Sequence, residues 1–198
     1  MLDIKDLTVR YNSRGRVTDA VNGISLSVEK GRFTGLVGES GSGKSTLMMA
    51  LLGLLPPRTE VKGKILFNGT DILRMSDREI RDMRWKEIAL VPQGAQNSFT
   101  PVMKIKSHIS EVLCVHLKMP GDEAERETAR LLSEVGLDPG IKERYPHELS
   151  GGQKQRASIA LALACSPSLL LADEPTTALD VIVQAEILEL LSNLRKTK

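Results

Sequence analysis

Nine consecutive residues have the types and spacing needed to bind a phosphate group: Gly38-Glu39-Ser40-Gly41-Ser42-Gly43-Lys44-Ser45-Thr46. They match the pattern G-x-x-x-x-G-K-[ST], in which glycines let the backbone turn its N–H groups toward an anion. Lys44 can reach the β- and γ-phosphates of a nucleotide, and the Ser45 hydroxyl can ligate Mg²⁺. Apolar runs at 33–37 and 47–52 predict a buried strand before the loop and a helix after it. A glycine-rich turn without a ligand is the weaker alternative, so the segment predicts a nucleotide-binding loop.

A second candidate anion site is Leu149-Ser150-Gly151-Gly152-Gln153, which precedes a helix-forming run at 156–165. A hydroxyl, backbone N–H groups and the positive end of a helix can together bind an anion. The alternative is an N-cap serine beside a flexible pair of glycines. Because the chain already has one phosphate loop, a second phosphate-facing helix end is the favoured prediction.

Polar side chains follow two short apolar runs that are typical of buried strands. Asp173 and Glu174 follow the run 169–172, and Gln93 follows the run 88–91. Successive side chains on a strand point in opposite directions. One carboxylate can therefore take part in the ligand shell of Mg²⁺ while the other contacts a water molecule. Strands that simply end in polar residues are the alternative.

The elements that must position these residues can be predicted from periodicity. Alternating apolar residues at 2–11 and 17–28 predict an antiparallel hairpin, and 61–69 predicts a strand that ends in an Asn-Gly turn. Residues 102–147 show helical spacing. Tyr11 lies in the first strand, where stacking on a nucleotide base and a strand-edge aromatic are equally good interpretations.

The amino-acid composition excludes few classes of protein function. Apolar residues make up 41% of the 198 residues and charged residues 26%, and the net charge of +2 argues neither for nor against nucleic acid. Cys114 and Cys165 lack metal-ligand spacing and are predicted to be reduced thiols. No apolar run reaches the roughly 18 residues that span a bilayer, and the N-terminus lacks a signal-peptide core. We expect a cytosolic protein whose contact with a membrane goes through partners.

The order of the motifs resembles the ATPase subunits of ABC transporters over nearly the whole chain. Gly53–Pro56, Tyr145–Glu148 and Ala172–Val181 look like the oligopeptide/dipeptide/nickel importer branch. The resemblance implies an α/β P-loop NTPase fold. It comprises a RecA-like core, an N-terminal antiparallel β subdomain and an inserted α-helical subdomain. It also implies a single domain over 1–198, divided into 1–94 with the β subdomain and Walker A loop, 95–153 with the helical subdomain and signature motif, and 154–198 with Walker B and the D-loop.

The resemblance also implies a role for each candidate residue. Tyr11 would stack on adenine, and Gly38–Thr46 would be the Walker A loop, with Lys44 taking part in catalysis. Glu174 would be the general base, and Gln93 would contact Mg²⁺ or the attacking water. The implied Mg²⁺ ligands are Ser45, Gln93 and Asp173. The residues implied to act across a dimer interface are the signature motif Ser150, Gly151, Gly152 and Gln153, and the D-loop aspartate Asp180.

The function implied by the resemblance is the ATP-hydrolysing motor of an importer. Two such domains would sandwich two ATP molecules and drive permease subunits at the inner face of the cell membrane. The cargo would be delivered by an extracytoplasmic solute-binding protein, and peptides, nickel chelates and oligosaccharides all occur as cargo in this branch. The alternative is a soluble ABC ATPase acting on nucleic acid or ribosomes, which a single motif set and near-neutral charge disfavour.

Two features depart from the family pattern. Relatives place an acid and a proline after the glutamine of the Q-loop, whereas here the run is Gln93-Gly94-Ala95-Gln96-Asn97-Ser98. The family also has a switch histidine after the D-loop helix, but the last histidine here is His147. We therefore expect a fragment of a longer subunit that stops before the H-loop. Such a fragment could bind ATP yet hydrolyse it weakly.

Overall fold

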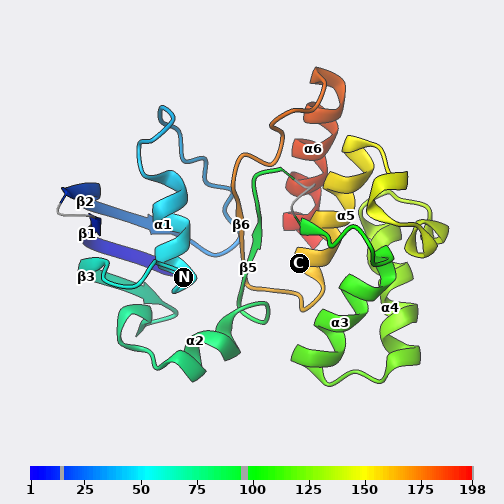
Figure 1. Cartoon of the computed structure of the whole chain (residues 1–198), viewed down its shortest axis with the longest axis horizontal. Helices are drawn as coiled ribbons and strands as arrows, with labels where there is room; N and C mark the ends of the chain where they lie inside the picture. The colour runs from blue at the N-terminus through cyan, green and yellow to red at the C-terminus, as the bar shows by residue number, and fades with distance from the viewer. Residues whose placement is uncertain (14–15, 95–97, 198) are drawn as a thin grey trace. The chain divides into compact units, whose positions relative to one another are not determined.

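The computed structural model describes residues 1–13, 16–94 and 98–197 (Figure 1). They form two compact units. The first unit contains Met1–Arg81 and the end of the chain from Arg195, and the second contains Asp82–Leu194. Each unit has its own β-sheet. The part of the Q-loop departure at 95–97 lies outside the described residues.

The first unit is built on an antiparallel sheet with the strand order β2-β1-β3-β4. The predicted N-terminal hairpin is confirmed as β1 paired with β2, and the Asn-Gly turn joins β3 to β4 with φ of 48° at Asn68 and 86° at Gly69. The strands are β1 (Leu2–Ser13), β2 (Arg16–Val28), β3 (Glu60–Phe67) and β4 (Thr70–Asp71).

An irregularity in β1 keeps its apolar residues on one face. Leu2, Ile4, Leu7 and Val9 are all buried, although Ile4 and Leu7 are three residues apart. The register shifts between Ile4 and Leu7, and Asp6 has a left-handed φ of 48°. The extra residue of such a bulge switches which positions face the core.

Gly63 in β3 allows the sheet to accommodate this irregularity. Its φ is +95°, and a Cβ placed there would lie 2.5 Å from the carbonyl oxygens of both Lys5 and Asp6. No side chain fits at that distance without a shift of the backbone. Gly63 is therefore a structural requirement of the bulge opposite it.

Residues 33–37 contradict the predicted buried strand. None of the described strands pairs with this segment. Its apolar side chains are exposed, with exposed fractions of 54% at Phe33, 46% at Leu36 and 95% at Val37. A strand exists only where a neighbour supplies the hydrogen bonds of its backbone, and a local apolar run does not specify that neighbour.

The helix predicted after the phosphate loop is confirmed in the first unit. The phosphate loop leads into α1 (Lys44–Leu51), and a short 3₁₀ turn, η1 (Ile72–Arg74), leads to α2 (Asp77–Met83), which runs across the boundary between the units. Ser76 precedes α2 and exchanges hydrogen bonds with Glu79, as in a capping box.

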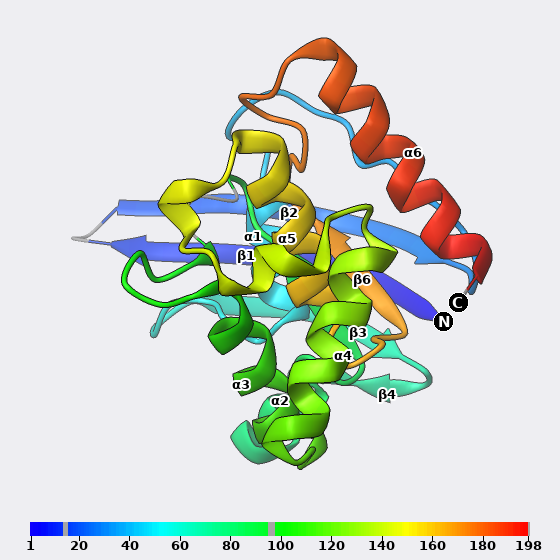
Figure 2. The same cartoon turned by 90° about the vertical axis from the view of Figure 1, so that its right-hand side faces the viewer.

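The second unit places two parallel strands beside a group of helices. Its strands are β5 (Ile88–Val91) and β6 (Leu169–Ala172), paired from Ile88↔Leu169 to Val91↔Ala172. Figure 2 shows α3 and α4 running alongside each other. The helices are α3 (Ile105–Leu117), α4 (Gly121–Glu134), α5 (Gly151–Leu163) and α6 (Val181–Thr197), of which α6 belongs to this unit as far as Leu194. The 3₁₀ turns are η3 (Pro139–Glu143) and η4 (Pro146–Glu148).

Helix α5 lies at the centre of the second unit. Every residue from Ala157 to Leu163 is buried, and Ile159 and Ala160 are fully inaccessible. Apolar residues of α3, α4 and β5 join the same core, among them Ile109, Leu132 and Val91. Because α5 follows Ser150 directly, this packing holds the second candidate anion site on a rigid element.

A cluster of ion pairs ties η3 to α3 and α4. Glu143 accepts hydrogen bonds from Lys104 at 3.0 Å and Lys106 at 2.7 Å, and Glu125 accepts one from Lys142 at 2.8 Å. The hydrogen bond from Lys106, followed by that from Lys104, lowers the pKa of Glu143 from 4.5 to about 2. The folded state therefore favours the ionised carboxylate.

We expect Gly63→Ala to lower the free energy of unfolding by roughly 1–3 kcal/mol, because the added Cβ meets two carbonyl oxygens at a left-handed φ. Urea denaturation followed by circular dichroism measures this. Gly121→Ala at the start of α4 is the control, because a Cβ there meets nothing within 4 Å. Equal losses in the two variants would contradict the role assigned to Gly63.

The lowered pKa of Glu143 predicts that the free energy of unfolding decreases in acid. Because its pKa is lower in the folded chain than in the unfolded chain, its contribution is present above about pH 4.5 and disappears as the pH falls toward 2. Glu143→Gln should be less stable than the unmodified chain at pH 6, with the difference shrinking below pH 4. Denaturation curves across this range check the trend, and exposed Glu111→Gln serves as the control. A pH-independent difference would refute the prediction.

Candidate functional site

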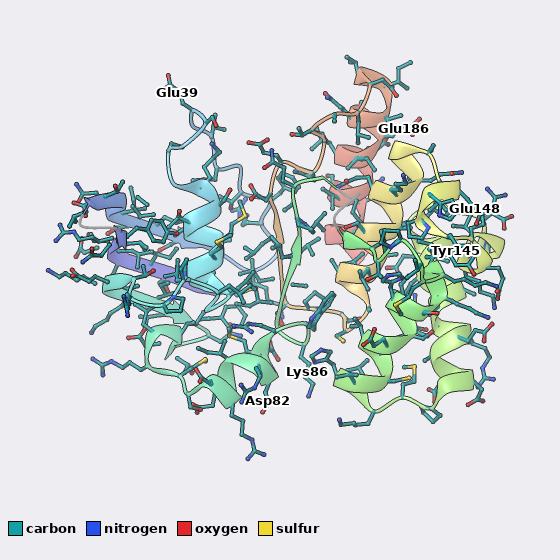
Figure 3. The ribbon with its side chains drawn as sticks, in the orientation of Figure 1. Glu39, Asp82, Lys86, Tyr145, Glu148 and Glu186 are labelled. Carbon is teal, nitrogen blue, oxygen red and sulfur yellow. The ribbon has the colours of Figure 1, made fainter. Side chains whose placement is uncertain are left out.

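The predicted phosphate loop lies in the first unit, with Lys44 as the first residue of α1. The Lys44 ammonium donates hydrogen bonds to the carbonyl oxygens of Gly38 at 2.8 Å and Glu39 at 2.7 Å. It also lies 3.4 Å from the Ser42 hydroxyl, and a turn from Glu39 to Ser42 is closed by a 3.2 Å backbone bond. Figure 3 shows Glu39 at the outer end of the loop. The loop thus curls around the positive charge of its own lysine.

Glycine is required where this loop passes β2. Gly43 is the N-cap of α1 with a φ of 93°, and a Cβ there would collide with the carbonyl oxygen of Ala20. The first turn of α1 is closed by the bond from Leu47 N–H to Gly43 O, so the N–H groups at 44–46 precede the helical ladder. These donors, the helix dipole and Lys44 make this end of α1 suited to an anion.

Tyr11 contacts the same helix. Its hydroxyl donates to Thr46 Oγ1 at 3.2 Å, and the residue is half-buried in β1. The structure therefore brings Tyr11 beside the phosphate loop, although stacking on a base stays a prediction. Ser40 and Gly41 lie in the exposed turn of the loop, and Ser45 is the second residue of α1.

The predicted acidic pair lies in the second unit, at the carboxyl ends of the paired strands. The Asp173 N–H donates to Val91 O at 2.9 Å and so extends the β5–β6 ladder. Glu174 follows with a left-handed φ of 45°. The Gln93 side-chain amide donates to Glu174 Oε2 at 2.8 Å. Residues 81 positions apart in the sequence are thus joined by a hydrogen bond that the sequence analysis did not predict.

Thr177 also contacts Glu174, and sequence reasoning did not single it out. Its hydroxyl donates to Glu174 Oε2 at 3.0 Å, while its backbone N–H donates to Glu174 O at 3.1 Å. A hydroxyl residue three positions after an acid in a turn was the available signal.

The second candidate anion site begins with a capping box. Ser150 Oγ accepts from the Gln153 N–H at 3.2 Å, and Gln153 Oε1 accepts from the Ser150 N–H at 3.0 Å. The N-cap serine of the alternative interpretation is therefore present, and the anion site stays a prediction. Gly152 allows close packing, because a Cβ there would lie 2.9 Å from a methyl group of Val183.

Asp180 lies next to this site in the second unit. Its carboxylate accepts from the Val183 N–H at 3.0 Å at the start of α6. A Cβ on Gly151 would contact Leu179 at 3.5 Å, so the signature segment and the D-loop segment are neighbours within the unit.

A groove of about 400 Å³ opens beside the signature segment. Arg156 lines it and donates to Val135 O at 2.9 Å and to Glu186 Oε2 at 2.8 Å. Figure 3 shows Glu186 projecting from α6. Sequence reasoning missed this pair, which spans 30 positions. The groove is lined by Gly136, Leu137, Asp138, Ile141, Ser150, Gly152, Gln153, Arg156, Val183 and Glu186.

The predicted Mg²⁺ ligands are all oxygen donors. Within the second unit, Gln93 and Asp173 follow adjacent strand ends. Ser45 belongs to the first unit. A hydroxyl, an amide oxygen and a carboxylate suit a hard cation such as Mg²⁺. Among the described residues, no cluster of three His, Cys, Asp or Glu side chains could hold a metal ion.

Comparison with known proteins identifies the family of this chain. The sequence profile of the family described as ABC transporter matches residues 21–177. The chain is 42% identical over 200 residues to the oligopeptide transport ATP-binding protein OppD of Bacillus subtilis, covering 99% of this chain and 56% of that protein. It is 41% identical to the dipeptide transport ATP-binding protein DppD of the same organism, covering 99% of this chain and 60% of that protein. It therefore spans little more than half the length of these relatives.

Solved structures confirm the fold class. The dimeric ATP-binding cassette MJ0796, captured in a post-hydrolysis state with ADP and Pi, superimposes with a TM-score of 0.87 at 29% identity. The match covers 100% of this chain and 84% of that one. In the described residues, no helix has the length and hydropathy to cross a bilayer. By its motifs, its fold and its relatives, the chain belongs to the ABC transporter family.

Proposed function

We propose that this chain binds and hydrolyses ATP as the motor of an importer, with peptides as its cargo. The observation that carries the proposal is the Glu174 carboxylate, held by Gln93 at the carboxyl ends of two parallel strands beside Asp173. In open α/β sheets this edge is where ligands bind. The names of the relatives, which refer to oligopeptide and dipeptide transport, support the choice of cargo.

Nucleotide binding is assigned to the first unit. The N–H groups at the start of α1 and the Lys44 ammonium would hold the β- and γ-phosphates, and Tyr11, which bonds to Thr46 on the same helix, would stack on the base. When bound, Mg²⁺ would neutralise phosphate charge through Ser45, Gln93 and Asp173. Lys44 already lies within the loop through its bonds to Gly38 and Glu39, so binding exchanges carbonyl partners for phosphate oxygens.

Hydrolysis is assigned to the second unit. The Glu174 carboxylate would take a proton from the water that attacks the γ-phosphate. The Gln93 amide would orient the carboxylate and this water. Positioning and charge stabilisation supply most of the rate enhancement in phosphoryl transfer. The left-handed backbone at Glu174 supports a functional role, because such strain concentrates at active sites.

The dimer and the permease are further parts of the proposal. Ser150–Gln153 and Asp180 would act on ATP bound by a second ATPase subunit, and the dimeric MJ0796 cassette supports this arrangement. Permease subunits would hold the dimer at the inner membrane face, with a solute-binding protein outside. A soluble ABC ATPase acting on nucleic acid or ribosomes is the second candidate, and the transport names of the relatives disfavour it.

We expect Glu174→Gln to bind Mg²⁺-ATP as the unmodified chain does but to lose hydrolysis by about 100-fold or more, because the amide cannot accept the proton of the water. Nucleotide titration and phosphate release measure the two effects. Exposed Glu189→Gln on α6 is the matched control, and Lys44→Ala should abolish binding itself. Hydrolysis by Glu174→Gln at the rate of the unmodified chain would remove Glu174 from the mechanism.

Ser150 can be tested for two separate roles. Ser150→Ala removes the helix cap and should cost about 1 kcal/mol of unfolding free energy, whereas Ser150→Asp retains a capping oxygen. Ser150→Asp also places a negative charge where we propose that a phosphate binds. We therefore expect near-normal stability and strongly reduced hydrolysis in Ser150→Asp. Full activity of Ser150→Asp would argue against phosphate contact at this helix end.

A further inference from the structure

We propose that Thr177 is a positioning residue that orients the Glu174 carboxylate for proton transfer. The inference rests on the proposed role of Glu174 as general base. Thr177 touches neither nucleotide nor water in this scheme and acts only through Glu174. Its consequence is that one of the two carboxylate oxygens, Oε1, is assigned to the attacking water.

The contact belongs to a turn that is closed twice. The backbone bond from Thr177 N–H to Glu174 O is 3.1 Å long, and the side-chain bond from Thr177 Oγ1 to Glu174 Oε2 is 3.0 Å long. The Gln184 amide on α6 holds this segment from outside by donating to Thr176 O at 3.2 Å and Leu179 O at 3.0 Å. The hydroxyl of Thr177 is thus positioned by a backbone segment that the side chain of Gln184 holds in place.

The two donors to Glu174 converge on the same atom. Oε2 accepts from Thr177 at 3.0 Å and from Gln93 at 2.8 Å. Two hydrogen bonds match the two lone pairs of one carboxylate oxygen. Oε1 is therefore the atom to take the proton of a water. The water oxygen bonds to the γ-phosphorus as its proton moves to Oε1. The bond from the γ-phosphorus to the bridging oxygen breaks, and its electron pair leaves with ADP.

The two donors to Glu174 come from different parts of the chain. Gln93 reaches Glu174 from the other strand, after β5, whereas Thr177 lies three residues away in the same turn. Any movement of Gln93 toward a metal ion or water breaks the first bond and leaves the second in place. Thr177 would thus preserve the orientation of the carboxylate when Gln93 changes partner.

The test compares two substitutions at Thr177 with one at its neighbour. Thr177→Val keeps the shape and removes the donor, Thr177→Ser keeps the donor, and Thr176→Val is the matched control. We expect Thr177→Val to lower kcat about tenfold or more with an unchanged KM for ATP, as for the loss of a hydrogen bond to a charged group. Thr177→Ser and Thr176→Val should stay within about threefold of the unmodified chain. An unchanged kcat in Thr177→Val would overturn the inference.

Two further measurements keep this result distinct from the proposed function and from misfolding. Glu174→Gln in the same assay tests the general base. If it is inactive while Thr177→Val is fully active, only the role of Thr177 fails. A high-resolution crystal structure of the unmodified chain tests the contact without any variant. A distance between Thr177 Oγ1 and Glu174 Oε2 beyond hydrogen-bonding range would overturn the inference.

Discussion

The parallel register of β5 and β6 is the constraint on which the chemistry that we propose for the second unit depends. Val91 pairs with Ala172, and the next N–H along, that of Asp173, bonds back to Val91 O. Gln93 and Glu174 therefore leave their strands at the same level. If one strand slipped by one residue, its side chains would turn to the opposite face of the sheet, and Gln93 and Glu174 would separate. Two four-residue strands thus bring together groups that lie 81 positions apart.

In the first unit, close contacts between backbone segments position the loop that we propose binds phosphate. Gly43 meets the carbonyl of Ala20, and Gly63 meets those of Lys5 and Asp6, so in both places a main chain passes where any side chain would collide. One contact sets the start of α1 against β2, and the other allows the β1 bulge that keeps Leu7 in the core. The loop that we propose holds phosphate is thus positioned by sheet backbone, which is more rigid than side chains.

Sequence reasoning succeeded where structure is set locally. The N-terminal hairpin, the Asn-Gly turn and the helix start at Ser150 follow from alternation, turn chemistry and capping signals that act within a few residues. The predicted strand at 33–37 was wrong, because pairing needs a neighbour that an apolar run does not supply. The Thr177–Glu174 bond was missed because it depends on a left-handed backbone that glutamate seldom adopts.

The capping box at Ser150 has a consequence for the entropy of ligand binding. The serine hydroxyl uses an oxygen lone pair to accept the Gln153 N–H, so its own hydrogen remains able to point toward an anion. A ligand could then be recognised without breaking the cap. The helix behind it, α5, is buried and already formed, so little conformational freedom would be lost when an anion arrives. The phosphate contact that we propose for this helix end would therefore cost little entropy of ordering the protein.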